Sequence, residues 1–184
     1  MKKIFYLCLL LIGMFSCNQG TEQKSAESAT NTNEAPMTGQ SGVKDDVSNP
    51  NIVQVAVGSK DHTTLVTAVK AAGLVDALSN AGPFTVFAPT NEAFGKLPAG
   101  TVDGLLKPDK KDALNDILGY HTYVGTLKAE YLQDGQTFEQ VNGGKITISK
   151  KDGKTFVNGN AEIIASIPTA NGMIHVINNV LLPK

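Results

Sequence analysis

The sequence predicts an α+β fold, because helical patterns fill the first part of its domain and strand patterns fill the rest. Between residues 61 and 118, apolar residues recur at helical spacing and are separated by Gly and Pro. From residue 137 onward, short runs rich in β-branched residues alternate with turn sequences such as Asn142-Gly143-Gly144. Helices followed by meandering strands favour this class over a repeating β-α-β order.

The first helical pattern starts near residue 61. Asp61 or Thr63 can cap its start, and Gly73 is a stop signal. The residues expected to share its buried face are Leu65, Val66, Val69 and Ala72. A second, short helix is expected over residues 74–79 and ends in the turn at 80–83.

A buried strand and a capped helix come next. Residues 84–88 form a short apolar run with β-branched and aromatic members, and Pro89 stops it. The hydroxyl of Thr90 can accept hydrogen bonds from the free amides of a helix that opens at Asn91 and runs through Lys96.

Two more helices are expected before the later strands. Thr101 is a candidate cap for residues 102–106, and Pro108 suits the first turn of a helix that reaches Leu118. The inward-facing residues of this last helix are expected to be Leu114, Ile117 and Leu118. Strands are then expected over residues 137–141, 145–150, 155–157, 161–166 and 173–180.

Three motifs, in this order and spacing, resemble the signature segments of one family. They are Thr-Val-Phe-Ala-Pro-Thr-Asn-Glu-Ala-Phe at 85–94, Ile-Leu-Gly-Tyr-His at 117–121, and Asn-Gly-Met-Ile-His-Val-Ile-Asn-Asn-Val-Leu-Leu-Pro at 171–183. The chain therefore resembles the fasciclin-like domain family, also called FAS1 or beta-Ig-H3. The resemblance implies a compact β-sandwich wedge with helices on its flank, and an adhesion-type function.

The resemblance also implies that the motif residues determine the fold. They are Thr85, Pro89, Thr90, Asn91, Phe94, Tyr120, His121, Asn171, Gly172, His175, Asn178 and Pro183. Thr85 and Asn91 are expected to satisfy backbone groups, and His121 matches a buried, hydrogen-bonded histidine of the family. Many relatives carry aspartate where this chain has Asn178, and the loss of that charge weakens any ionic role there.

Candidate catalytic and metal sites are sparse. The three histidines, His62, His121 and His175, are not at metal-ligand spacing, and no serine lies in a Gly-x-Ser-x-Gly context. His175 alternates with Ile174 and Val176, so it should point to the other, partly exposed face of its strand. His62 is expected to be solvated at a helix start. We therefore expect no enzyme activity, no metal and no cofactor.

The composition argues against a nucleic-acid partner. All 16 basic residues are lysine, 17 residues are acidic, and the chain has no arginine and no tryptophan. Arginine dominates base-edge contacts, and no basic patch is visible.

The N-terminal segment predicts export. Lys2 and Lys3 precede an apolar run from Ile4 to Phe15, which predicts a signal peptide over residues 1–17. Residues 14–17, Met-Phe-Ser-Cys, resemble a bacterial lipobox that would make Cys17 a lipid-bearing residue, with ordinary cleavage or a free cysteine as the alternatives. Residues 18–46 are polar and predict a disordered tether to one FAS1 domain over 47–184.

Two functions remain open. The first is an envelope-anchored, non-enzymatic module that binds a protein or glycan at a cell surface or in a matrix. The alternative is an envelope binding protein for a small apolar or carbohydrate ligand. The membrane is the expected partner through the lipid anchor, with the outer membrane or cell surface favoured; without lipidation the protein would be secreted or periplasmic. The oligomeric state stays open.

Overall fold

The computed structural model describes residues 49–183. The predicted signal peptide, Cys17 and the tether lie outside these residues. The helices are α1 (Ile52–Gly58), α2 (Thr63–Ala72), α3 (Val75–Ser79), α4 (Asn91–Gly95), α5 (Thr101–Leu105) and α6 (Lys111–Tyr120). The strands are β1 (Phe84–Pro89), β2 (Thr122–Val124), β3 (Thr137–Glu139), β4 (Lys145–Lys151), β5 (Lys154–Val157), β6 (Ala161–Thr169) and β7 (Gly172–Ile177). The predicted α+β class is confirmed.

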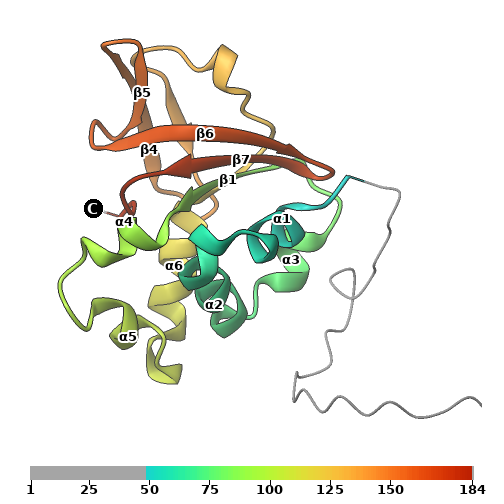
Figure 1. The fold of residues 1–184 in the computed structure, drawn as a ribbon, viewed down its shortest axis with the longest axis vertical. Coiled ribbons are helices and arrows are strands. Elements are labelled where there is room, and N and C mark those ends of the chain that lie inside the picture. The colour runs from blue at the N-terminus through green and yellow to red at the C-terminus, as the bar shows by residue number, and fades with distance from the viewer. Residues whose placement is uncertain (1–48, 184) are drawn as a thin grey trace, which may run out of the picture. The chain divides into compact units, whose positions relative to one another are not determined.

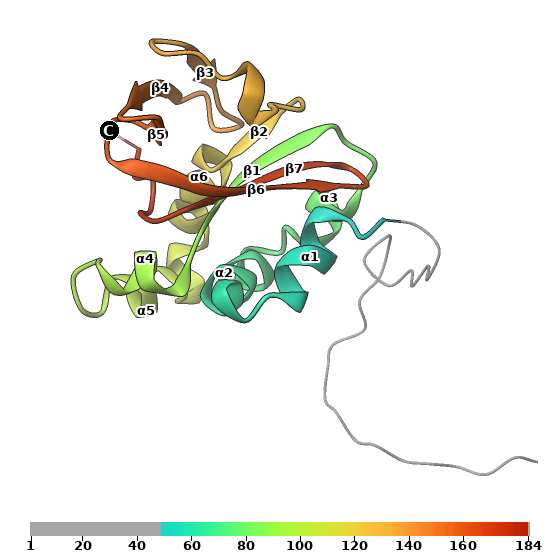
Figure 2. The same cartoon turned by 45° about the horizontal axis from the view of Figure 1, so that its top comes forward.

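The strands form one mixed sheet in the order β2-β1-β7-β6-β5-β4-β3. Strands β1 and β7 are parallel, and every other neighbouring pair is antiparallel. The two ends of the sheet meet, because the Val141 amide donates to the Thr122 carbonyl at 2.9 Å. The helices lie on one side of the β1-β7-β6 layer, and β3, β4 and β5 lie on the other (Figures 1 and 2).

Two hydrophobic cores follow from this arrangement. One lies between the helices and the sheet and includes Leu65, Leu118 and Ile174; the other lies among the strands and includes Ile146 and Ile148. Alternate residues of β1 and β7 enter the two cores, so both strands are buried on both faces. Strand β4 instead has one solvent-exposed face, as the alternation of its sequence predicts.

Helix α1 is not among the predicted helices. Its sequence is rich in β-branched valine, which does not favour a helix, and tertiary contacts hold it instead. Asn51 accepts from the Gln54 amide at 2.9 Å, while the Gln54 side chain accepts from the Asn51 amide at 2.8 Å. This capping box was the available sequence signal. The Ile52 amide also donates to the Asn171 side chain at 2.9 Å.

Several element boundaries differ from the predicted ones. Thr101 is the first residue of α5 and makes no capping bond, because Gly100, at φ 80°, occupies the cap position. Pro108 lies in a separate 3-10 turn before α6. Strand β6 continues three residues beyond its predicted end, whereas β7 ends three residues early, at Ile177.

Candidate functional site

The first and last signature segments leave the sheet at the same edge. Because β1 and β7 are parallel neighbours, Pro89 pairs with Ile177 at their carboxyl ends. The Thr90 amide then donates to the Ile177 carbonyl at 3.2 Å. Thr90 and Asn178, which are far apart in the sequence, are thereby placed at one site.

A cleft of about 240 Å³ opens at this edge. We call it the strand-end cleft, and its lining residues are Asp61, Thr90, Asn91, Glu92, Ile164 and Asn178. Ile164 lies at an irregularity between Ile163 and Ala165 where the β6–β7 register shifts. The bulged position leaves the Ile164 side chain 53% exposed, beside the polar groups of the cleft.

Thr90 and Asn91 link the cleft to two helix starts. The Thr90 hydroxyl accepts from the Ala93 amide at 3.2 Å and caps α4, as predicted. The Asn91 side chain accepts from the Thr64 amide at 3.0 Å and donates to the Lys60 carbonyl at 2.9 Å.

The cap of α2 therefore comes from Asn91. The predicted caps, Asp61 and Thr63, are wrong: the residue before α2 is His62, which makes no side-chain capping bond. The start of α2 is held by a residue of another segment, which a local reading of the sequence does not reveal.

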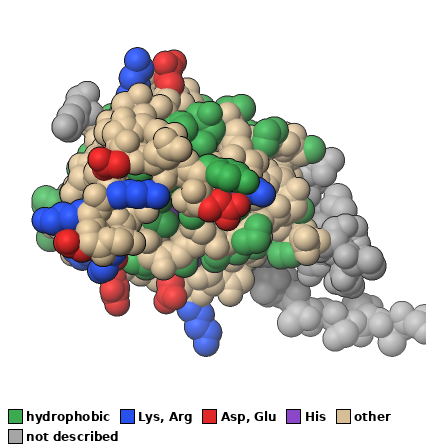
Figure 3. All heavy atoms as spheres, turned by 90° about the horizontal axis from the view of Figure 1, so that it is seen from above, with side chains coloured by type: hydrophobic (Ala, Val, Ile, Leu, Met, Phe, Trp, Pro, Cys, Tyr) green, Lys and Arg blue, Asp and Glu red, His purple; other side chains and the backbone are tan. Residues whose placement is uncertain are grey.

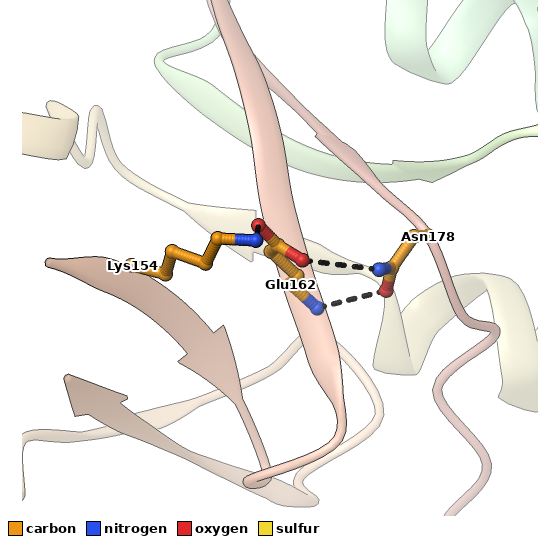
Figure 4. Close-up of polar contacts among 3 residues, drawn as sticks. All are labelled: Lys154, Glu162 and Asn178. Atoms are coloured by element: carbon orange, nitrogen blue, oxygen red, sulfur yellow. Dashed lines mark hydrogen bonds and ion pairs between the residues drawn. The ribbon is translucent and has the colours of Figure 1, made fainter. Parts of the chain in front are cut away.

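Asn178 lines the cleft. Its side chain faces Glu162, a residue of β6 (Figure 4). Its side-chain oxygen accepts from the Glu162 amide at 2.9 Å, and its NH₂ group donates to the Glu162 carboxylate at 3.4 Å. The other carboxylate oxygen of Glu162 pairs with Lys154 at 2.8 Å, and this hydrogen bond raises the pKa of Lys154. The ion pair here is thus formed by Glu162 and Lys154. Asn178 is neutral and donates a hydrogen bond to the Glu162 carboxylate.

Two carboxylates of the cleft remain free for a ligand. Within residues 49–183, Asp61 and Glu92 make no side-chain hydrogen bond or ion pair in the structure. Neither residue was singled out as a site residue from the sequence, because their convergence depends on the long-range bonds of the Asn91 side chain to Lys60 and Thr64. In the same part of the chain, no group of three His, Cys, Asp or Glu residues could hold a metal ion.

His121 connects two signature segments through hydrogen bonds, the role that the family resemblance implies. Its ring is 3% exposed; Nδ1 donates to the Ile117 carbonyl at 2.8 Å, and Nε2 accepts from the Leu181 amide at 3.0 Å. Its own carbonyl accepts from the Phe87 amide at 2.8 Å. Burial lowers the pKa of His121 to about 4, so the ring is neutral at pH 7.

The predictions for the other two histidines are wrong. His175 is fully buried, because the second core covers the face of β7 that was expected to be partly wet. Its Nε2 donates to the Leu127 carbonyl and its Nδ1 accepts from the Ser166 hydroxyl, both at 2.7 Å. Burial lowers the pKa of His175.

His62 is 6% exposed, not solvated. Its Nδ1 lies 2.8 Å from the Ser59 hydroxyl. Its Nε2 is buried, and within residues 49–183 no hydrogen bond of good geometry reaches it. Burial lowers the pKa of His62, against the opposing effects of the Asp61 carboxylate and the nearby Ala88 backbone.

The remaining polar motif residues make long-range hydrogen bonds. The buried Thr85 hydroxyl donates to the Gly125 carbonyl at 2.7 Å. The Asn171 side chain donates to the carbonyls of Leu78 and Asn80 at 2.8 and 2.9 Å. The Tyr120 hydroxyl donates to the Lys145 carbonyl at 2.8 Å.

The other motif residues pack without such bonds. Pro89 is buried, Phe94 packs against the core beneath the helices, and Pro183 is half-buried. Gly172, at φ 155°, lies so close to the Phe84 backbone that a Cβ would collide with it. These four residues contribute to the packing of the fold.

Two apolar cavities lie beneath the helices. They measure about 40 and about 30 Å³, which is room for only about two or three water molecules. On the face drawn in Figure 3, hydrophobic side chains lie in separate groups among Lys and Asp or Glu residues. At about 240 Å³, the strand-end cleft is much larger than either apolar cavity.

The fold defines the class of protein. A solved structure, the FAS1 domain pair from the insect cell adhesion molecule Fasciclin I, superposes with a TM-score of 0.65 at 17% identity, covering 72% of this chain and 51% of that one. This likeness shows the fold alone. The sequence model of the Fasciclin domain matches residues 60–183, and the chain belongs to this family.

Two relatives are similar to the chain in sequence. Protein sll1483 of Synechocystis is 52% identical over 132 residues, which are 72% of this chain and 73% of that protein. The cell surface glycolipoprotein MPB83 of Mycobacterium bovis is 41% identical over 110 residues, 60% of this chain and 48% of that protein. Within the described residues, no helix is both long and apolar enough to cross a membrane.

Proposed function

We propose that this chain is an envelope-anchored, non-enzymatic FAS1 module that binds a partner at a cell surface or in a matrix. The observation that carries the proposal is the strand-end cleft, where the ends of both signature strands frame two free carboxylates and an exposed Ile164. The motif residues His121, His175 and Asn171 are engaged in hydrogen bonds within the fold, so the cleft lining offers the groups that a partner can reach.

In this proposal, the N-terminal segment exports the domain and anchors it to the membrane. The signal peptide would export the chain, and lipid on Cys17 would hold it at the membrane. A tether over residues 18–46 would have an r.m.s. span of about 30 Å, enough to lift the domain clear of lipid headgroups. One relative carries the name of a cell surface glycolipoprotein, which supports this placement.

The alternative function is binding of a small envelope ligand. The sizes of the cavities favour a polar ligand such as a carbohydrate over an apolar one, because the apolar cavities measure only about 40 and 30 Å³ against about 240 Å³ for the strand-end cleft.

The proposal is tested by attachment of cells that lack the gene and carry either the native chain or Cys17→Ser. The native chain should restore attachment to surfaces or to other cells. Cys17→Ser should abolish lipid labelling, move the protein to the soluble fraction and fail to restore attachment. Unchanged attachment after deletion of the gene would contradict the adhesion function, and a Cys17→Ser protein that stays in the membrane would contradict the anchor.

A further inference from the structure

We infer that the strand-end cleft binds one neutral sugar residue of a glycan partner. The inference rests on the proposed function, because it names the partner chemistry of the same site. A pyranose ring presents hydroxyl groups around its rim and apolar C–H groups on its faces. A site for such a ring needs exposed hydrogen-bonding groups beside an apolar wall, in a hollow of the size of one ring.

The cleft supplies hydrogen-bond acceptors that nothing in residues 49–183 occupies. The carboxylates of Asp61 and Glu92 can accept only, and ionised acceptors form stronger hydrogen bonds than neutral ones. Sugar hydroxyls are suitable donors because each carries one hydrogen and two lone pairs.

The cleft also supplies donors. The Thr90 oxygen already accepts from the Ala93 amide, which leaves its hydroxyl hydrogen to point elsewhere. The NH₂ group of Asn178 makes only a long bond of 3.4 Å to Glu162. Its second hydrogen is therefore available to a sugar oxygen.

Ile164 provides the apolar wall. Its side chain is 53% exposed and lies at the register shift of β6, in the lining of a cleft whose other residues are polar. Packing of a sugar face against Ile164 would remove this apolar surface from water.

Size and charge restrict the ligand further. At about 240 Å³, the cleft has six times the volume of one apolar cavity and eight times that of the other, so of these three hollows it is the one of a size for a sugar ring. Lys96, whose ammonium donates to the Asn178 carbonyl at 2.7 Å, places one positive charge beside the cleft. The two carboxylates outweigh it, and the remaining negative charge would disfavour uronic acids and sulfated or phosphorylated sugars. A neutral hexose is therefore preferred over its acidic counterpart.

The test is an NMR titration of the isotope-labelled full chain with methyl glucoside, methyl galactoside, methyl mannoside and the matching methyl glucuronide. At least one neutral glycoside should shift amide signals of residues 90–92 and 164, with a dissociation constant on the order of 1 mM. The glucuronide, which replaces one CH₂OH group by a carboxylate, should bind at least about tenfold more weakly.

Paired variants separate the cleft from general effects. Asp61→Asn with Glu92→Gln should weaken binding of the neutral glycoside by about tenfold or more, since two charge-assisted hydrogen bonds are lost. Asp103→Asn with Glu130→Gln removes two exposed carboxylates outside the cleft and should leave binding unchanged. Amide spectra without ligand should overlay away from the substituted sites, which confirms that both variants are folded.

Three results would overturn the inference. They are the absence of cleft shifts with every neutral glycoside, equal weakening in both paired variants, and cleft shifts with Nα-acetyl-lysine amide alone. The last result would assign the cleft to a basic side chain of a protein partner, and the proposed adhesion function would then stand while the sugar assignment fell.

Discussion

His121 joins α6 to the segment after β7 through both of its ring nitrogens. The Ile117 carbonyl can only accept, so Nδ1 carries the hydrogen and Nε2 keeps the lone pair that accepts from Leu181. A second proton on Nε2 would leave the Leu181 amide without its acceptor and would place a charge in a buried site. The imidazole of His121, in the Tyr-His motif, must therefore be neutral to make both hydrogen bonds.

Stability should consequently fall in mild acid. The pKa of His121 in the folded state, about 4, lies below the unfolded value of about 6.5. Between these values the unfolded chain binds more protons, so the contribution of His121 is fully present above pH 6.5 and is lost as the pH falls toward 4. Between pH 7 and pH 4.5 the loss should reach roughly 2 kcal/mol in the free energy of unfolding, measured by urea titration at the two pH values. His121→Gln should be less stable at pH 7 and show a flatter pH dependence in this window; an unchanged slope would contradict the assignment.

Gly172 is the glycine whose replacement should be most costly. An added Cβ would collide with the Phe84 backbone, and the positive φ adds strain for any other residue. Gly172→Ala should therefore lose about 3 kcal/mol or more, or fail to fold. Gly104→Ala is the matched control, because Gly104 lies within α5 with nothing near its missing Cβ; it should be neutral or more stable by up to about 1 kcal/mol. Similar thermal midpoints for Gly172→Ala and Gly104→Ala would contradict the steric requirement for glycine at position 172.

Among the elements, α2 shows why local sequence rules were insufficient. Its start has suitable capping residues nearby, yet the oxygen that caps it comes from Asn91, at the start of α4. The same side chain donates to the Lys60 carbonyl, so it fixes the turn before α2 as well. The first signature segment thus positions two helices and one wall of the cleft.

Removal of the Asn91 side chain should destabilise the domain more than removal of one cap. Asn91→Ala loses the acceptor for Thr64 and the donor to Lys60, and we expect a cost of about 1–3 kcal/mol in urea unfolding. Asn91→Asp keeps an acceptor at the helix start, where negative charge is favourable, and should lose less. Equal losses for the two variants would show that the α2 cap contributes nothing.

For the whole molecule, the sequence predicted the α+β class, the β4 alternation and the Thr90 cap, since each depends on residues close in the chain. The burial of His175 was mispredicted because alternation was taken to mean one wet face. Strand β7 instead lies between two cores, and the nearly continuous apolar run around His175 was the available signal. The strand-end cleft could not be predicted, because it requires the parallel pairing of β1 and β7, two strands far apart in the sequence.

The central claim is that the signature segments build the fold while the cleft at their ends binds the partner. The most direct test is attachment of cells that carry the native chain, Asp61→Asn with Glu92→Gln, or Asp103→Asn with Glu130→Gln, at equal surface levels. We predict that the cleft variant loses attachment and that the matched control retains it, with both proteins unfolding at the native temperature. Full attachment by the cleft variant would contradict the claim.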